Sequence, residues 1–162
     1  MSKQYENFGP ADFDKFDCVK IALGVYLILL FILRGYLIWL MSVTNMQDRV
    51  SIIAWVYPDP KLFYLSLLSG LGGILTVFLL SLRRPGANSF IKKMCSQLKN
   101  ILFIALFFDW LINLVAYYFW QMQSKEWLLI NSVTIIIAVI YLYSSKRVNI
   151  NVQEFPEKLP EK

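Results

Sequence analysis

Four apolar runs dominate this sequence, and each is long enough to cross a bilayer as a helix. They cover residues 19–41, 62–82, 101–120 and 127–143. A membrane-spanning helix needs about 17–25 predominantly apolar residues. The chain has 162 residues and is 57% hydrophobic, whereas soluble domains are about 45–50% apolar. We therefore expect an all-α membrane protein, built as a bundle of four transmembrane helices.

This pattern divides the chain into three parts: an N-terminal segment (1–18), a transmembrane domain (19–144) and a tail (145–162). The first apolar run is longer than the roughly 7–15 apolar residues of a signal peptide and follows a mostly polar segment, so we expect it to be retained. The tail is polar, and we expect little fixed structure there. Within it, Val148, Ile150 and Val152 alternate with asparagines, as in a strand that pairs with a partner.

The basic residues are distributed unevenly between the loops. Twelve of the 16 Lys and Arg residues fall in the N-terminal segment, in the loop between the second and third runs, and in the tail. The other two loops hold Arg49, Lys61 and Lys125, while Arg34 lies inside the first run. Because Lys and Arg collect on the cytoplasmic side, we expect a multi-pass membrane protein with both termini in the cytoplasm. The net charge of +5 then reports topology, and no nucleic-acid partner is expected.

Two connecting segments are expected to lie along the membrane surface. Residues 50–57 are apolar but too few to cross a bilayer, which indicates an interfacial or re-entrant segment on the outer side. On the inner side, Phe90, Ile91, Met94 and Leu98 recur at helical spacing, which predicts a short amphipathic helix. Tryptophans favour membrane interfaces, and four of them fall near the expected outer one: Trp39, Trp55, Trp120 and Trp127.

The outer segment ends in the sequence Tyr57-Pro58-Asp59-Pro60. One interpretation makes Asp59 a ligand contact held between two prolines. The other makes Asp59 the N-cap of the second apolar helix and Pro60 its first residue. Asp is a preferred N-cap and Pro is enriched at the first helical position. We therefore favour the helix cap.

Two charged residues of opposite sign lie well inside the apolar runs, Arg34 and Asp109. With a rise of 1.5 Å per residue, Arg34 lies about 21 Å beyond Lys20, and Asp109 about 15 Å beyond Lys99. Helical side chains lean toward the helix N-terminus, so Arg34 leans toward the depth of Asp109. We expect these two residues to pair, with Asn113 as a further hydrogen-bond partner. Alternatively, Arg34 extends toward the headgroups and Asp109 is protonated.

The sequence offers little chemistry of other kinds. It contains no histidine, which removes the usual general base and the commonest metal ligand. We identify no catalytic, cofactor-binding or metal-binding residues and expect no enzyme activity. In the second run, Ser66 and Gly70, and likewise Ser69 and Gly73, are small residues four apart. This spacing permits close helix packing, within the bundle or between two copies.

Several short motifs resemble the YfeZ-like family, a group of uncharacterised bacterial inner-membrane proteins. They are Asp14-Lys15, the stretch RGYLIWL from Arg34, YPDP from Tyr57, FYLSLLSGL from Phe63, and Arg83-Arg84. The chain departs from that pattern where it enters the first run, with Phe16-Asp17-Cys18-Val19. The resemblance implies an inner-membrane setting and a domain of unknown function, with no catalytic residues.

Two functions fit these features. The first is a non-enzymatic accessory or scaffold protein that acts through membrane partners, since each notable residue has a structural explanation. The second is a small oligomeric transporter or channel, with Asp109 as its coupling site and Arg34 as the counter-charge, since intramembrane carboxylates often carry protons or cations. The bilayer is the one partner that both functions require.

Overall fold

The computed structural model describes residues 5, 8–14, 16–45, 50–57, 59–120 and 124–156. Within these ranges the chain is helical, apart from one isolated β-bridge between Phe13 and Val19. The elements in chain order are η1 (Pro10–Asp12), α1 (Leu23–Ile32), α2 (Arg34–Thr44), α3 (Ser51–Val56), α4 (Pro60–Ser81), α5 (Ser89–Ser96), α6 (Leu98–Tyr118), α7 (Lys125–Ser144) and α8 (Lys146–Gln153).

Three of the described helices, α4, α6 and α7, are each long and apolar enough to cross a membrane. Helices α1 and α2 meet the same test only together, as a pair bent by 66°. The described ranges therefore hold three straight candidate spans and one broken one. Their lengths and composition indicate a membrane protein with three or four crossings.

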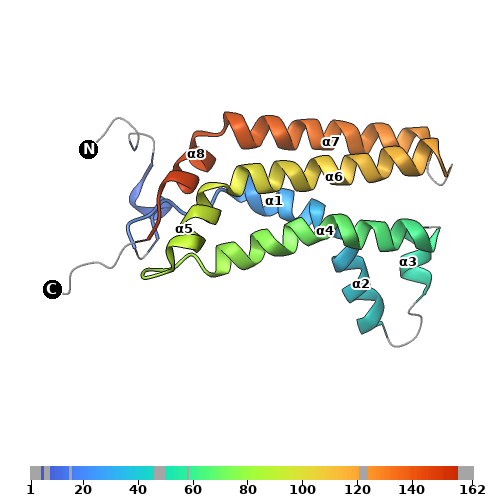
Figure 1. Cartoon of the computed structure of the whole chain (residues 1–162), viewed down its shortest axis with the longest axis horizontal. Coiled ribbons are helices and arrows are strands. Elements are labelled where there is room, and N and C mark those ends of the chain that lie inside the picture. The colour runs from blue at the N-terminus through green and yellow to red at the C-terminus, as the bar shows by residue number, and fades with distance from the viewer. Residues whose placement is uncertain are drawn as a thin grey trace.

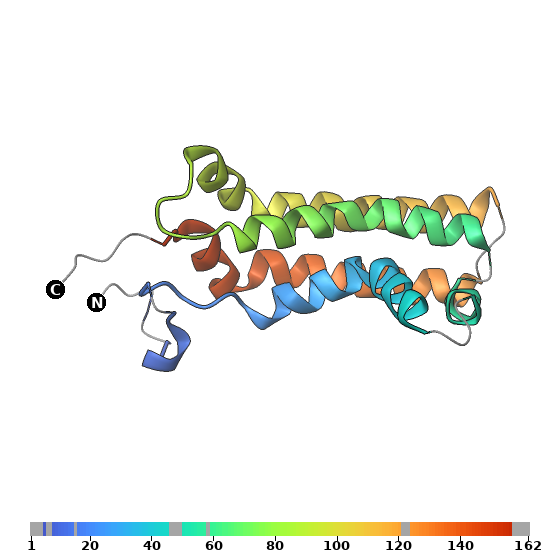
Figure 2. The same cartoon turned by 90° about the horizontal axis from the view of Figure 1, so that it is seen from below.

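The long helices α4, α6 and α7 run side by side, and α1 packs against them over one half of their length (Figures 1 and 2). A buried apolar cluster joins α1 to α6 and α7, with Val25, Leu29, Leu102, Leu106 and Leu142 among its members. The short helices α5 and α8 lie at one end of the bundle, and α2 and α3 lie toward the other (Figure 1).

The first apolar run differs from the continuous helix expected over residues 19–41. The chain is extended up to the N-cap residue Ala22, and the helix breaks at Leu33. Sharp helix kinks have local causes such as glycine or a side chain that takes a backbone carbonyl. Both occur here, since Arg34 Nη1 donates to the carbonyl of Phe31 at 3.1 Å and Gly35 follows. A Cβ on Gly35 would meet Ser66 Oγ at 2.5 Å, so the bent helix crosses α4 very closely.

The remaining apolar runs form α4, α6 and α7, whose ends differ from the expected ones by a few residues. The apolar segment at 50–57 forms the short helix α3, and the predicted amphipathic segment between the second and third runs forms α5. Arg49, Pro58 and the end of the tail from residue 157 lie outside the described residues.

The expectation of little structure after residue 145 is wrong for residues 146–153, which form α8. The strand interpretation of Val148, Ile150 and Val152 is wrong as well. Ser145 caps the helix by accepting a hydrogen bond from the backbone N–H of Val148. Val148 and Ile150 are buried, so tertiary packing supplies the stability that the polar composition of the segment lacks.

Candidate functional site

The site predicted from the two intramembrane charges is present as a direct contact. Arg34 Nη2 donates to both carboxylate oxygens of Asp109, at 3.0 Å each. The carboxyl side chain is 2% exposed and the Arg34 side chain 19% exposed. The guanidinium also stacks over the ring of Phe31, 4.5 Å from its centroid. The contact therefore ties the first residue of α2 to the middle of α6.

A third helix completes this charge cluster, which we define as Arg34, Ser69, Asp109 and Asn113. Ser69 on α4 donates to Asp109 Oδ1 at 2.9 Å. Asn113 lies one turn beyond Asp109 on α6 and donates to the Asp109 carbonyl at 2.7 Å and to Oδ2 at 3.4 Å. Each carboxylate oxygen thus has at least two donors. A buried charge that is paired and hydrogen-bonded in this way is a stable junction between helices.

The stripe of small residues on α4 explains how three helices approach closely enough to share one carboxylate. Ser66, Ser69, Gly70 and Gly73 are all buried. A Cβ on Gly70 would meet the ring of Tyr36 at 2.7 Å. The stripe therefore packs within the bundle, against the bent pair α1–α2. The sequence had left open whether it packs within the bundle or between two copies.

At the start of α4, Asp59 and Pro60 form the helix cap expected from the sequence. Asp59 is the N-cap, its Oδ1 accepts from the backbone N–H of Lys61 at 2.7 Å, and Pro60 is the first helical residue. Beside this cap, Tyr57 is buried against Phe63 and Ala116. The cap thus fixes the start of α4 where the chain returns from α3.

Comparison with family models matched residues 8–154 to the family described as protein of unknown function DUF2919. The chain belongs to this family. No curated protein and no solved structure matched the chain. The DUF2919 match begins before α1 and ends just after α8, so it includes the charge cluster and both ends of the bundle. It carries no assigned activity.

A second polar network closes the end of the DUF2919 bundle that carries α5 and α8, where α8 holds the extended segment that precedes α1. The Asn151 side chain accepts from the N–H of Ala22 at 2.9 Å and donates to the carbonyl of Val19 at 2.7 Å. Arg147 forms an ion pair with Asp12 at 3.1 Å. Glu154 accepts from the N–H of Val19 at 2.8 Å. These contacts bring the start and end of the matched region together.

The two cysteines of this DUF2919 protein are buried, free thiols at the same end. Burial raises the pKa of the Cys95 thiol, and it raises the pKa of Cys18 with a further contribution from the nearby Asp14 carboxylate. Both thiols therefore stay protonated at neutral pH, and protonated thiols are poor nucleophiles. Among the residues that the structure describes, no cluster of three potential metal ligands occurs.

Sequence reasoning missed two members of these networks. The sequence presents Ser69 as one of the small residues that permit close helix packing, and depth alone does not reveal which helix faces Asp109. Asn151 was read as part of a polar tail. Its only signal was its position between Ile150 and Val152, which places an amide among apolar residues.

Proposed function

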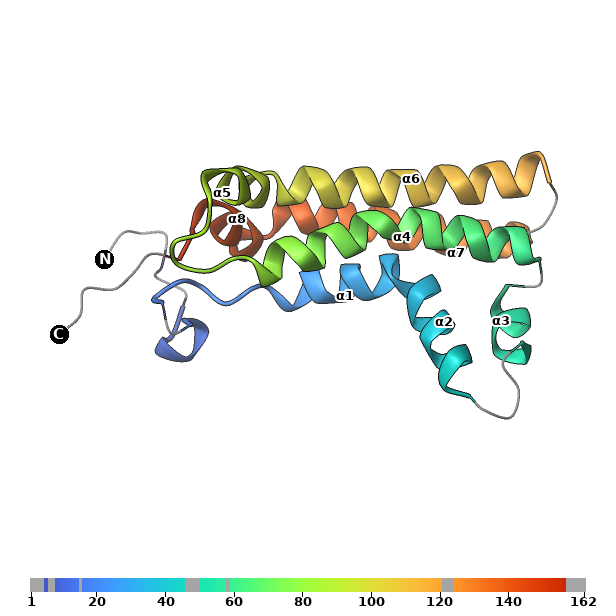
Figure 3. The ribbon, with the colours of Figure 1, turned by 60° about the horizontal axis from the view of Figure 1, so that its bottom comes forward.

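We propose that this protein is a non-enzymatic scaffold of the inner membrane, with both termini in the cytoplasm, and that it binds a partner membrane protein through the arm formed by α2 and α3. The observation that carries the proposal is the 66° bend between α1 and α2, which the contact between Arg34 and Asp109 holds in place. The bend directs α2 away from the bundle, and α3 lies beside α2 (Figure 3).

The arm presents a large apolar surface that the bundle does not use. Trp55 on α3 is 87% exposed. On α2 the exposed apolar residues are Leu37, Trp39, Leu40, Met41 and Val43. In a bilayer, helices associate by close packing of such surfaces. A transmembrane helix of another protein has the apolar chemistry that this surface requires.

The charge cluster is better suited to holding the arm than to carrying a substrate. Asp109 is 1% exposed, and its oxygens are shared between an arginine, a serine and an asparagine. A coupling site must release its counter-charge during each transport cycle, and here that step would break the contact that sets the bend. The packing therefore favours a structural role.

The proposed orientation rests on where the basic residues lie in the fold. Lys20, Arg83, Lys92, Lys99 and Arg147 all belong to the end that carries α5 and α8, and such an excess is typical of the cytoplasmic side. Two exposed positions test it, Ser96→Cys at that end and Lys125→Cys at the other. A membrane-impermeant maleimide on intact cells should label only Lys125→Cys, because the proposed topology places Ser96→Cys in the cytoplasm. The native Cys18 and Cys95 are buried and should not be labelled. Labelling of Ser96→Cys would reverse the proposed topology.

The scaffold function is tested by purifying the tagged protein in mild detergent and identifying stoichiometric companions by mass spectrometry and by reciprocal capture. The decisive comparison uses two exposed tryptophans, since Trp55 lies on the arm and Trp127 on α7. Trp55→Ala should remove the companion and Trp127→Ala should retain it. Equal retention by both variants would contradict binding through the arm.

The transporter alternative makes the opposite prediction for Asp109→Asn. A scaffold that depends on the charge cluster should lose abundance and helical packing. A transporter should remain folded and lose only flux. A well-folded, homogeneous homo-oligomer of this variant, without a companion and without the flux of the wild-type protein, would favour transport and end the scaffold proposal.

A further inference from the structure

We propose that the inner end of the groove between α1 and α4 binds an anionic phospholipid, with its phosphate at Lys20 and Arg83 and an acyl chain along the groove. The proposal depends on the membrane setting proposed above, and the cytoplasmic leaflet follows from the proposed topology. It does not depend on the α2–α3 arm or on any partner protein.

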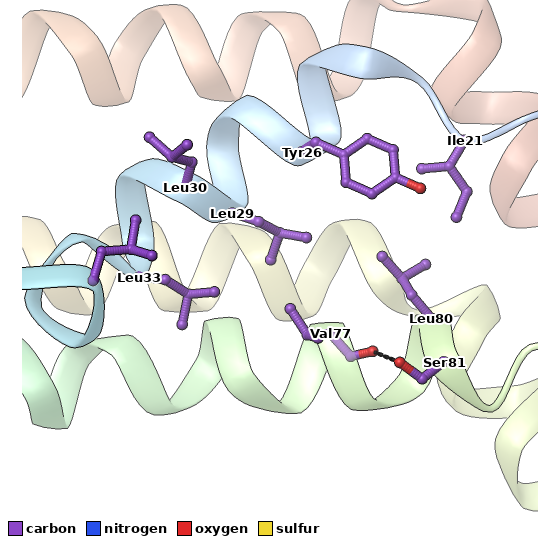
Figure 4. Close-up of a pocket in the computed structure, with 9 residues that line it drawn as sticks. Ile21, Tyr26, Leu29, Leu30, Leu33, Val77, Leu80 and Ser81 are labelled. Atoms are coloured by element: carbon purple, nitrogen blue, oxygen red, sulfur yellow. Dashed lines mark hydrogen bonds between the residues drawn. The ribbon is translucent and has the colours of Figure 1, made fainter. Parts of the chain in front are cut away.

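The acyl-chain part of the site is an apolar groove of about 420 Å³, within the roughly 300–1,000 Å³ typical of ligand sites. Its lining residues are Ile21, Tyr26, Leu29, Leu30, Leu33, Leu37, Val77, Leu80 and Ser81. Figure 4 shows Leu29 of α1 and Val77 of α4 on facing sides of the space between the two helices. The Ser81 hydroxyl is occupied, because it donates to the carbonyl of Val77 at 2.9 Å.

The groove continues into a second cavity of about 350 Å³ with a different character. The two cavities share Ile21, Tyr26 and Leu80, and the second adds Asp14, Lys20, Arg83 and Pro156. In Figure 4 the Tyr26 hydroxyl points toward the end where Ile21 and Leu80 lie. The apolar groove therefore ends in a cationic pocket. This arrangement matches a phospholipid, whose acyl chain is apolar and whose phosphate is anionic.

The two cations of this pocket are held by neutral groups. Lys20 Nζ donates to the carbonyl of Ala11 at 2.7 Å, and Arg83 Nη2 donates to the carbonyl of Glu154 at 3.1 Å. In the described part of the chain neither forms an ion pair. An ammonium has three donor protons and a guanidinium has five, so each cation keeps donors that these carbonyls do not use. Such donors favour a phosphate oxygen, because charge-assisted hydrogen bonds are the strong ones.

One carboxylate, Asp14, lines the same pocket. Its Oδ1 accepts from the backbone N–H groups of Phe16 at 2.8 Å and Cys18 at 3.2 Å, so the turn before Val19 already engages it. Two cations against one carboxylate leave the pocket with an excess of positive charge. A lipid with a net negative headgroup neutralises this excess, and a zwitterionic lipid does not.

Native mass spectrometry of the purified protein tests the site, with phosphatidylglycerol and phosphatidylcholine of identical acyl chains as probes. We expect phosphatidylglycerol to bind at least tenfold more tightly, a difference of about 1.4 kcal/mol. The double variant Lys20→Gln/Arg83→Gln should lose this preference. Its matched control, Arg84→Gln/Lys93→Gln, removes the same charge from exposed positions of the same end and should keep it.

A second variant tests the groove without touching the cations. Val77→Trp places a large side chain in the groove and should weaken phosphatidylglycerol binding about as much as the charge variant, while glycerol 3-phosphate, which has the phosphate but no acyl chain, should not compete. Each variant is first compared with wild type in melting temperature and monodispersity. Equal binding of the two lipids, equal loss in both double variants, or full binding by Val77→Trp would each overturn the proposal.

Discussion

Two ion pairs among the described residues of this DUF2919 protein have nearly the same length and very different surroundings. Arg34 and Asp109 lie 3.0 Å apart, with side chains 19% and 2% exposed, whereas Arg147 and Asp12 lie 3.1 Å apart, with side chains 32% and 36% exposed. Exposed pairs contribute little to stability, about 0–1 kcal/mol. Breaking a buried pair by removing one partner costs about 3–5 kcal/mol. Distance alone therefore says little about which pair holds the fold.

The largest effect is expected for Asp109→Asn, which leaves Arg34 without its charge partner inside the bundle. We expect a loss of about 3–5 kcal/mol in the free energy of unfolding. Circular dichroism during titration with sodium dodecyl sulfate in mixed micelles measures it. Glu126→Gln, at an exposed position of α7, is the matched control and should be nearly neutral. An equal loss in both variants would contradict the claim that the buried carboxylate contributes more to stability than an exposed one.

The next effect is expected at the inner end, for Asn151→Ala. This change leaves the N–H of Ala22 and the carbonyl of Val19 without their partner, and an unsatisfied buried polar group costs about 1–3 kcal/mol. The same titration measures the loss. Asn149→Ala, which removes a side-chain contact with Lys99, should cost less. A larger loss for Asn149→Ala would show that the amide of Asn151 is not what holds the extended segment.

Ser69→Ala tests how far the buried pair depends on its neutral neighbour. Interhelical hydrogen bonds in membrane proteins contribute about 0.6 kcal/mol on average and at most about 1.7 kcal/mol. We expect a loss in the upper part of this range, because the acceptor is a carboxylate. Ser81→Ala, whose hydroxyl bonds only to its own helix, is the control. A loss as large as that of Asp109→Asn would mean that the arginine alone does not hold the carboxylate and that the serine is equally necessary.

The smallest effect is expected for Asp12→Asn in the exposed pair, about 0.2–1 kcal/mol. It should shrink further as salt is raised, because the screening length falls to about 3 Å at 1 M. The loss caused by Asp109→Asn should change little over the same range. Thermal unfolding at low and high salt compares them. Equal salt dependence would indicate that water and ions reach the charge cluster.

Much of this architecture follows from one-dimensional information. Run length places α4, α6 and α7, and the residue types at Asp59 and Pro60 place the start of α4. Counting rise per residue brings Arg34 and Asp109 to comparable depths. Depth, however, is only one coordinate. The rotation of each helix about its axis depends on packing, so the identity of Ser69 as the third partner did not emerge from the sequence.

The bend and α8 escaped prediction for a different reason. Gly35 is the one poor helix former beside Leu33 in this apolar run, and the break also needs the Arg34 guanidinium, which bonds both Asp109 and the Phe31 carbonyl. α8 is a polar segment that becomes helical against the buried end of the bundle. In both places a contact between residues far apart in the chain decides the local structure.

The bend also has a consequence for the bilayer itself. At 1.5 Å per residue, α1 is about 15 Å long, and a helix of the length of α2 tilted by 66° advances only about 7 Å more along the same axis. The hydrocarbon core is about 30 Å thick. In the membrane setting proposed above, lipids on this flank shorten or tilt to match it, at a cost of a fraction of a kcal/mol per Å. The flank formed by α1 and α2 thus has a shorter hydrophobic length than the bilayer. Two membrane proteins that place such flanks together reduce the deformation of the lipids between them.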